Sequence, residues 1–122
     1  MPTNPDWNGL RARLDGEVVR PGTAAYHCVR RPALARFGAS RPDAVVLATT
    51  DADAAEAVRF ARQCGQRIRP RSGGHCFAGR SSGAGMVLDV TALRSVNVVD
   101  ATVVVGAGAR PGDLDDAYEL PA

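Results

Sequence analysis

The chain has 122 residues, 45% of them hydrophobic, and a formal net charge of +2 at pH 7. This length allows one domain with a buried core, and no apolar run approaches the ~20 residues needed to cross a membrane. The first residues lack the basic and hydrophobic stretches of a secretory signal, so we expect a cytoplasmic protein without a membrane partner.

The first 40 residues predict an N-terminal helical segment. Trp7, Leu10 and Leu14 fall on one face of a short helix over residues 4–14. Residues 23–31 are expected to be partly helical, and residues 32–41 have the composition of a loop. We therefore divide the chain into residues 1–40 and a second unit over residues 41–122.

The second unit opens with a strand–helix–strand pattern. Residues 44–48 form a continuous apolar run, as in a strand covered on both faces. Thr50 or Asp51 caps a helix that Gly65 ends in a left-handed conformation. Its apolar stripe is expected to comprise Ala54, Ala57, Val58 and Ala61. Residues 66–70 form the second strand, and such a connection predicts two parallel strands.

The remaining elements complete an α/β fold with a small parallel sheet flanked by helices. Residues 86–90 predict a third strand, and residues 95–99 and 102–105 predict two short strands around a turn at Asp100-Ala101. A helix is expected over residues 111–120, with Pro111 in its first turn.

The segment from Arg71 to Ser82 carries the residues that point to function. The adjacent Gly73 and Gly74 allow backbone N–H groups to turn toward a phosphate or pyrophosphate. Arg71 adds positive charge, and His75 places a nucleophilic imidazole directly after the glycines. Hydroxyl donors come from Ser72, Ser81 and Ser82. The segment leaves the carboxyl end of a predicted strand, where open α/β sheets bind ligands, which favours a cofactor loop with a reactive histidine.

Nucleic acid is the alternative ligand for the basic residues around this loop, namely Arg67, Arg69, Arg71 and Arg80. The net charge is only +2, and aromatic residues that could stack on bases make up 5% of the chain. We therefore favour a phosphate-bearing cofactor and predict no nucleic-acid partner.

The other motifs are interpreted as structural. The segment from Gly106 to Gly112 has proline at the third glycine position of a dinucleotide fingerprint, so we expect a tight strand-to-helix turn there. The histidine–cysteine pairs at 27–28 and 75–76 do not match zinc-ligand spacings, so no metal site is predicted. Cys28 and Cys64 are expected to be small buried residues. Asp89 is expected to cap a turn. No residue is assigned a catalytic acid, base or nucleophile role.

Arg71-Ser-Gly-Gly-His-x-Phe-x-Gly-x-Ser81 resembles the FAD-binding domain of berberine-bridge-like flavin oxidoreductases, which belong to the vanillyl-alcohol-oxidase superfamily. The resemblance extends in order over roughly residues 40–114. It implies that residues 41–122 form the N-terminal subdomain of a PCMH-type FAD-binding domain. It further implies that Arg71, Ser72, Gly73, Gly74, Gly79 and Ser81 hold the pyrophosphate, and that His75 bonds covalently to the 8α-methyl carbon of the flavin.

The resemblance implies an FAD-dependent oxidoreductase that oxidises an alcohol-bearing carbon of a sugar or secondary metabolite. The family's small-molecule substrate would bind a C-terminal domain that these residues do not include, so we expect this chain to be an incomplete part of such an enzyme and inactive alone. Two alternatives remain open: a phosphate-ligand-binding module without catalysis, and a truncated, non-catalytic remnant.

Overall fold

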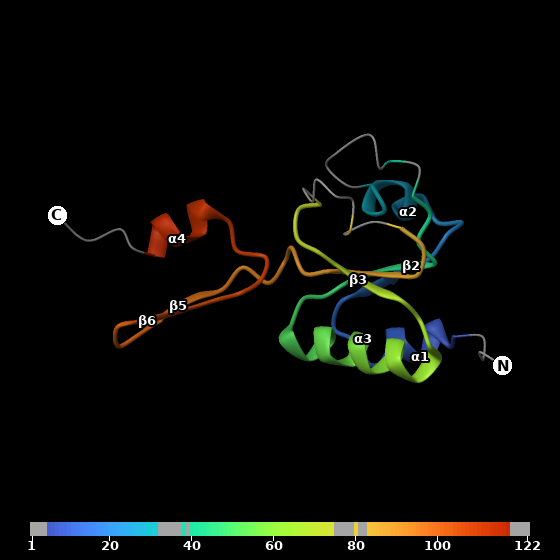
Figure 1. The fold of residues 1–122 in the computed structure, drawn as a ribbon, viewed down its shortest axis with the longest axis horizontal. Helices are drawn as coiled ribbons and strands as arrows, with labels where there is room; N and C mark the ends of the chain where they lie inside the picture. Colours follow the sequence, from blue (N-terminus) through green and yellow to red (C-terminus); the bar gives the residue numbers. More distant parts are fainter. Residues whose placement is uncertain (1–4, 32–37, 39, 75–79, 81–82, 118–122) are drawn as a thin grey trace.

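The computed structural model describes residues 5–31, 38, 40–74, 80 and 83–117. Helices and strands alternate up to β3, and three further strands then precede α4, which confirms the α/β class (Figure 1). In chain order the elements are α1 (Trp7–Ala12), β1 (Glu17–Val19), α2 (Ala24–Val29), β2 (Ala44–Leu47), α3 (Asp51–Cys64), β3 (Ile68–Arg71), β4 (Met86–Asp89), β5 (Val96–Val99), β6 (Thr102–Val105) and α4 (Pro111–Ala117).

Four strands form one sheet in the order β1-β2-β4-β3. β2 and β3 each pair in parallel with β4, which lies between them and aligns Val87 with Val45. The predicted parallel direction of β2 and β3 is therefore confirmed. β1 pairs antiparallel with β2 and was not predicted. Gly16, just before β1, makes this pairing possible, because a Cβ there would lie 1.9 Å from the Leu47 carbonyl oxygen.

Helix α3 begins and ends where its capping residues predict. The hydroxyl of Thr50 accepts a hydrogen bond from the Asp53 N–H at 3.1 Å, and Gly65 adopts a left-handed φ of 67°. The predicted apolar stripe is wrong at Val58, which is 42% exposed, whereas Phe60 is buried. The Phe60 ring packs against Trp7 of α1 at a centroid distance of 5.2 Å, so the buried face is turned toward α1.

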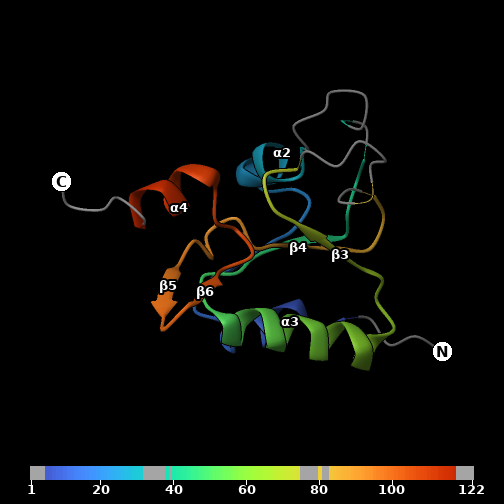
Figure 2. The ribbon, with the colours of Figure 1, turned by 60° about the vertical axis from the view of Figure 1, so that its left-hand side comes forward.

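The sheet is covered by helices on both faces. α3 and α1 lie on one side and α2 on the other, as Figures 1 and 2 both show. Val46 points into a core shared with α1 and α3, and the adjacent Val45 is also 0% exposed. On the α2 side, the Tyr26 hydroxyl donates to the Pro42 carbonyl at 2.6 Å and fixes the helix beside the start of β2. The prediction of a strand buried on both faces is thus confirmed.

β5 and β6 form a separate antiparallel hairpin that extends away from the four-stranded sheet together with α4 (Figure 1). The predicted turn is present: Val99 aligns with Thr102, and Asp100 has a positive φ of 54°. Valine side chains of the hairpin are largely exposed, in contrast to those of the sheet. Within the described residues, no helix is both long and apolar enough to traverse a membrane.

Candidate functional site

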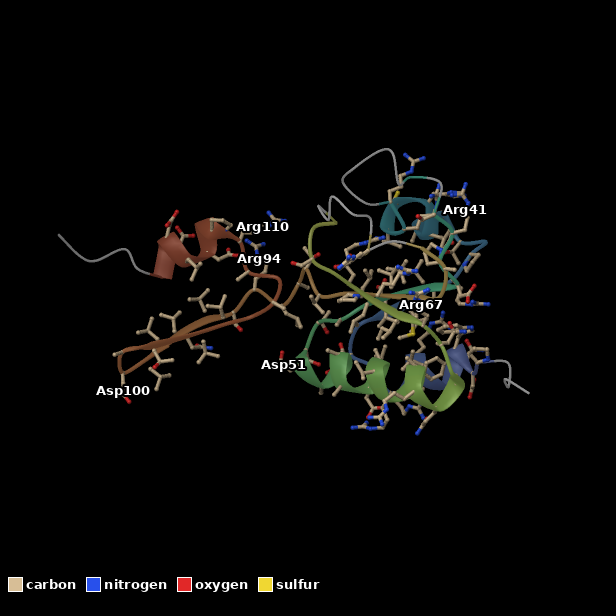
Figure 3. All side chains as sticks on the ribbon, viewed as in Figure 1. Arg41, Asp51, Arg67, Arg94, Asp100 and Arg110 are labelled. Carbon is tan, nitrogen blue, oxygen red and sulfur yellow. The ribbon has the colours of Figure 1, made fainter. Side chains whose placement is uncertain are left out.

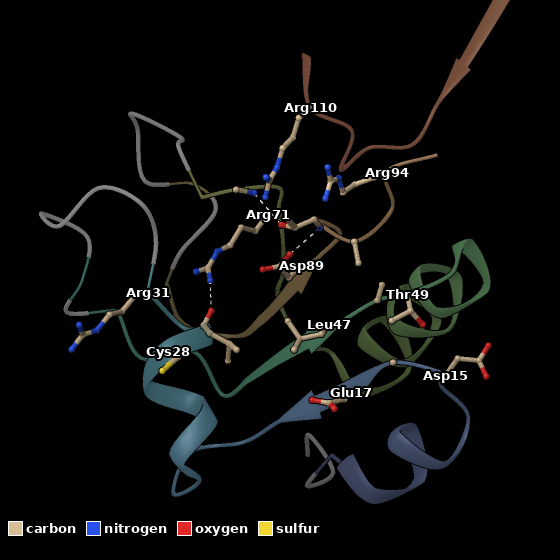
Figure 4. Close-up of a pocket in the computed structure, with 16 residues that line it drawn as sticks. Asp15, Glu17, Cys28, Arg31, Leu47, Thr49, Arg71, Asp89, Arg94 and Arg110 are labelled. Atoms are coloured by element: carbon tan, nitrogen blue, oxygen red, sulfur yellow. Dashed lines mark hydrogen bonds between the residues drawn. The ribbon is translucent and has the colours of Figure 1, made fainter. Parts of the chain in front are cut away.

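A hollow of about 720 Å³ lies at the carboxyl ends of the parallel strands (Figure 4). Leu47, Arg71 and Asp89, the last residues of β2, β3 and β4, all line it. Other lining residues come from the start of β1, from α2, and from the segments around Thr91 and Arg110. Since ligands of open α/β sheets bind at this end of the strands, the hollow is the candidate ligand site.

The predicted glycine loop borders this hollow. Gly73 and Gly74 have φ values of 74° and 76°, a left-handed conformation that glycine adopts at little cost. The Gly73 N–H donates to the Thr91 hydroxyl at 3.1 Å, which holds the loop against the segment after β4. Arg71 and Gly73 line the hollow, and the exposed Ser72 lies between them. His75, Gly79 and Ser81, also predicted here, lie outside the described residues.

Arg71 connects the glycine loop to helix α2. Its side chain is 3% exposed, and it donates to the carbonyl oxygens of Val29 at 2.6 Å and Arg30 at 2.9 Å. Burial lowers the pKa of Arg71, and the nearby Asp89 carboxylate opposes that shift. The guanidinium stays charged at neutral pH, because an arginine side chain loses its proton only in strongly basic solution. Arg71 therefore fixes the wall that α2 contributes to the hollow.

Asp53, in the first turn of α3, holds the opposite wall and was not predicted as a site residue. Its buried carboxylate accepts the backbone N–H groups of Asp15 and Gly16, each at 2.9 Å, and that of Thr49 at 3.0 Å. Burial alone would raise the pKa of Asp53, but these hydrogen bonds, together with the one from the Thr49 hydroxyl, lower it below 3.8. The ionised side chain of Asp53 thereby joins two segments that line the hollow, one at residues 15–16 and one at Thr49.

The arginines that line the hollow are mostly not those of the predicted cluster. Arg71 is the member of that cluster that does so, and it is joined by Arg31, Arg94 and Arg110. Figure 3 shows Arg94 and Arg110 close together where the hairpin leaves the sheet, with Arg67 within the sheet region. Local sequence could not reveal this grouping, since it depends on how residues 91–94 and 110 fold back.

Arg94 is held by a bidentate pair with Asp113 of α4. Two guanidinium nitrogens of Arg94 lie 3.0 and 2.7 Å from the carboxylate oxygens, and the Arg110 N–H donates to Asp113 Oδ2 at 2.8 Å. The hydrogen bond from Arg94, followed by that from the Arg110 backbone, lowers the pKa of Asp113 to about 2. This pair fixes α4 against the segment before β5.

The glycines before α4 serve backbone packing, as predicted. The Gly106 and Gly108 N–H groups donate to the Ser95 and Leu93 carbonyls at 2.8 and 2.9 Å. A Cβ at Gly106 would lie 2.2 Å from the Leu93 carbonyl oxygen. The segment is thus a tight turn against the backbone that precedes β5.

Of the remaining side-chain predictions, the one for Asp89 is confirmed and the one for Cys28 is wrong. Asp89 caps a turn as expected, because its Oδ1 accepts the Thr91 N–H at 2.9 Å. The prediction that Cys28 is buried is wrong: this residue is exposed at the rim of the hollow, since α2 is short and covers the sheet with other residues. Cys64 is partly buried against the core. Among the residues that the structure describes, no three His, Cys, Asp or Glu side chains are grouped as metal ligands.

Parallel strands ending at a hollow with a glycine turn and several arginines define a nucleotide-binding class of α/β protein. The family model described as "FAD binding domain" matches residues 42–120, and the chain belongs to this family. The resemblance to berberine-bridge-like FAD-linked oxidoreductases is thereby confirmed, and FAD is the family's cofactor.

Individual relatives agree with this assignment. Berberine bridge enzyme-like 23 of Arabidopsis thaliana is 33% identical over 84 residues, covering 64% of this chain and 16% of the relative. (R)-6-hydroxynicotine oxidase of Paenarthrobacter nicotinovorans is 30% identical over 104 residues, covering 83% and 22%. The solved structure of Physcomitrella patens BBE-like 1 superimposes with a TM-score of 0.78 at 31% identity, covering 91% of this chain and 26% of that one. The chain thus spans about a quarter or less of each of these proteins.

Proposed function

We propose that this chain forms the FAD-binding part of an oxidoreductase that removes hydride from an alcohol-bearing carbon of a sugar or secondary metabolite. The observation that carries the proposal is the hollow at the ends of β2, β3 and β4, three strands that the FAD-binding family model matches. Its volume of about 720 Å³ lies within the range of cofactor sites. When bound, FAD supplies the hydride-accepting chemistry of the reaction.

The donor groups around the hollow fit a dinucleotide. Arginine guanidiniums match the charge and the planar geometry of phosphate oxygens. In the proposal the pyrophosphate is held by the loop from Arg71 to Gly74 together with Gly79 and Ser81. Arg71 and Asp53 support this loop and the facing wall through the hydrogen bonds described above, so both act as positioning residues.

A test of the loop compares two glycines with the same backbone conformation. Gly73→Val places a branched side chain at the hollow, at a φ of 74°. Gly65→Val is the matched control, because Gly65 has a φ of 67° but ends α3 with no atom within 4 Å of an added Cβ. After expression with FAD and gel filtration, the visible flavin absorbance per protein should fall sharply in Gly73→Val and persist in Gly65→Val. Equal flavin content in the two variants would show that the loop is only a turn.

We propose His75 as the point of covalent attachment, on the basis of its place directly after the glycine pair and of the family motif. Acid-precipitated protein should retain flavin, and a peptide containing His75 should carry the flavin mass. His75→Ala should release the flavin into the acid supernatant while leaving noncovalent binding in place. Complete release of flavin from the unmodified protein would remove the covalent proposal alone.

Substrate selection is proposed to reside outside these 122 residues. In support, the chain spans 16% and 22% of the two relatives compared, and no residue in it has been assigned an acid–base role. Residues 1–122 with FAD should therefore give no peroxide and no dye reduction across a panel of alcohols and sugars. Steady turnover by residues 1–122 would contradict this division.

A further inference from the structure

Among the described residues, the four arginines that line the hollow differ in what their side chains already bind. The guanidinium of Arg71 is buried and donates to the carbonyl oxygens of Val29 in α2 and of Arg30, which caps that helix. The guanidinium of Arg94 is paired with both carboxylate oxygens of Asp113. These two arginines therefore build the walls of the hollow, and their charge is partly balanced by Asp89 and Asp113 respectively.

Arg110 is different, because its backbone is fixed while its guanidinium is not hydrogen-bonded to any described residue. Its N–H donates to Asp113 at 2.8 Å, and its carbonyl accepts the Asp113 N–H at 2.9 Å. Among the described residues its guanidinium has no hydrogen bond and no ion pair, its charge acts on Asp113 only as a minor contribution, and the side chain is exposed. A fixed backbone below an unengaged cation is suited to ligand binding, since little ordering is required beyond the side chain itself.

The direction of the side chain supports this role. In Figure 4 Arg110 points toward the residues at the ends of β3 and β4, whereas Arg31 points away from them. Of the acidic lining residues, Asp15 and Glu17 belong to the β1 side, across the hollow from Arg110, whereas Asp89 lies at the end of β4 beside Arg71. On the side where Arg110 and Arg94 meet the glycine loop, the carboxylates of Asp89 and Asp113 partly balance Arg71 and Arg94, so the charge of Arg110 leaves this side net positive and favours an anionic group of a ligand.

We propose that the guanidinium of Arg110 binds the diphosphate of the dinucleotide held in this hollow, as a second anchor besides the glycine loop. This inference rests on the proposed function, because the diphosphate is that of FAD. Arginine suits the task, since its planar fork can donate two parallel hydrogen bonds to phosphate oxygens. The proposed contact also sets the orientation of the bound dinucleotide. Its diphosphate lies toward Arg110, and its uncharged parts extend from there.

The test is a titration of FAD into the full chain carrying His75→Ala, which removes the proposed covalent bond, after the protein has been freed of flavin. Arg110→Gln in this background should weaken FAD binding about tenfold, the value of one charge-assisted contact. It should also make the affinity less dependent on salt concentration, because an ionic contact with phosphate is lost. Arg110→Lys should restore part of the affinity and the salt dependence.

Arg62→Gln is the matched control, since Arg62 is an exposed arginine of α3 outside the hollow. It removes the same charge and should leave FAD affinity unchanged. Arg110→Gln should melt at the parent temperature, because its side chain is exposed. Parent-like affinity and salt dependence in Arg110→Gln would overturn the inference while leaving FAD binding intact. Absence of FAD binding in the His75→Ala parent itself would overturn the proposed function, and the inference with it.

Discussion

Valine is abundant both in the four-stranded sheet and in the β5–β6 hairpin, and it has opposite environments in the two. Val45 and Val46 of β2 are 0% exposed, whereas Val98 and Val104 of the hairpin are 53% and 56% exposed. The difference comes from what covers each sheet: helices pack on both faces of the larger one, while the hairpin extends away from it with α4 (Figure 2). Valine content thus indicates a strand but does not determine whether that strand is buried.

Each of the two regions also contains a carboxylate with a lowered pKa, but the cause of the lowering differs. Asp53 and Asp113 both have a lowered pKa. Asp53 reaches this state in a buried position through backbone N–H donors, and Asp113 does so at the surface through Arg94. Buried hydrogen bonds resist salt, whereas an exposed ion pair is screened by it. The interactions of each region can therefore be tested by two substitutions, one that affects its carboxylate and one at a valine.

The largest effect is expected from Asp53→Ala. The substitution leaves the N–H groups of Asp15, Gly16 and Thr49 without their acceptor. The free energy of unfolding should fall by about 3 kcal/mol, since each unsatisfied buried donor is costly. Urea denaturation followed by circular dichroism measures the change. A loss below about 1 kcal/mol would show that water replaces the carboxylate.

The same residue gives a pH dependence of defined sign. Because the pKa of folded Asp53 lies below 3.8, its stabilisation is complete above the unfolded pKa and is lost as pH falls through the folded value. Unfolding free energies measured between about pH 2 and 5 should rise with pH. The rise should be smaller in Asp53→Asn, whose side chain does not titrate, and an identical slope in both proteins would contradict this account.

Val46→Ala is the next largest change. It removes about two methyl groups from the core shared by β2, α1 and α3, at roughly 0.8 kcal/mol each, and leaves a cavity. The unfolding free energy should fall by about 2 kcal/mol, as measured by the same denaturation experiment. A negligible effect would mean that the surrounding helices close the cavity.

Arg94→Gln tests the hairpin side through the pKa of Asp113. Removal of the main partner should raise that pKa from about 2 toward 3.8 without reaching it, because the Arg110 N–H remains bonded. A carboxyl titration followed by NMR measures the shift. About 1 M salt should move the value of the parent protein in the same direction, while the pKa of Asp53 should remain as it was.

The smallest effect is expected from Val98→Ala, the same substitution as in β2 but on the exposed hairpin. The unfolding free energy should change by no more than about 0.5 kcal/mol, because this side chain is already half exposed. Comparison with Val46→Ala in one experiment gives the contrast directly. A loss similar to that of Val46→Ala would show that the hairpin valines are covered in solution.

Elements with strong local signals were predictable from the sequence. Thr50 and Gly65 set the ends of α3, and continuous apolar runs marked β2 and β4. β1 was missed because its three residues carry no pattern and depend on pairing with β2. The burial of Phe60 in place of Val58 depends on the position of α1, which no local pattern specifies.

The site was predictable only where its residues are contiguous. Arg71 and Gly73 were singled out from their motif, and both line the hollow. Asp53, Arg94 and Arg110 were not, because their roles arise from partners brought near by the fold. The roles of His75, Gly79 and Ser81 stay predictions, as do the division at residue 40 and the cytoplasmic location.

The hydrogen bonds that shape the hollow have a consequence for the order of folding. Asp53 binds partners 37 and 38 residues away, and Arg71 binds partners 41 and 42 residues away. Closing such long loops carries an entropic cost that must be met before the contacts can form. We therefore expect both walls to assemble only once the sheet has formed, so that recovery of the ability to capture ligand during refolding would lag behind the appearance of α3 and report completion of the fold.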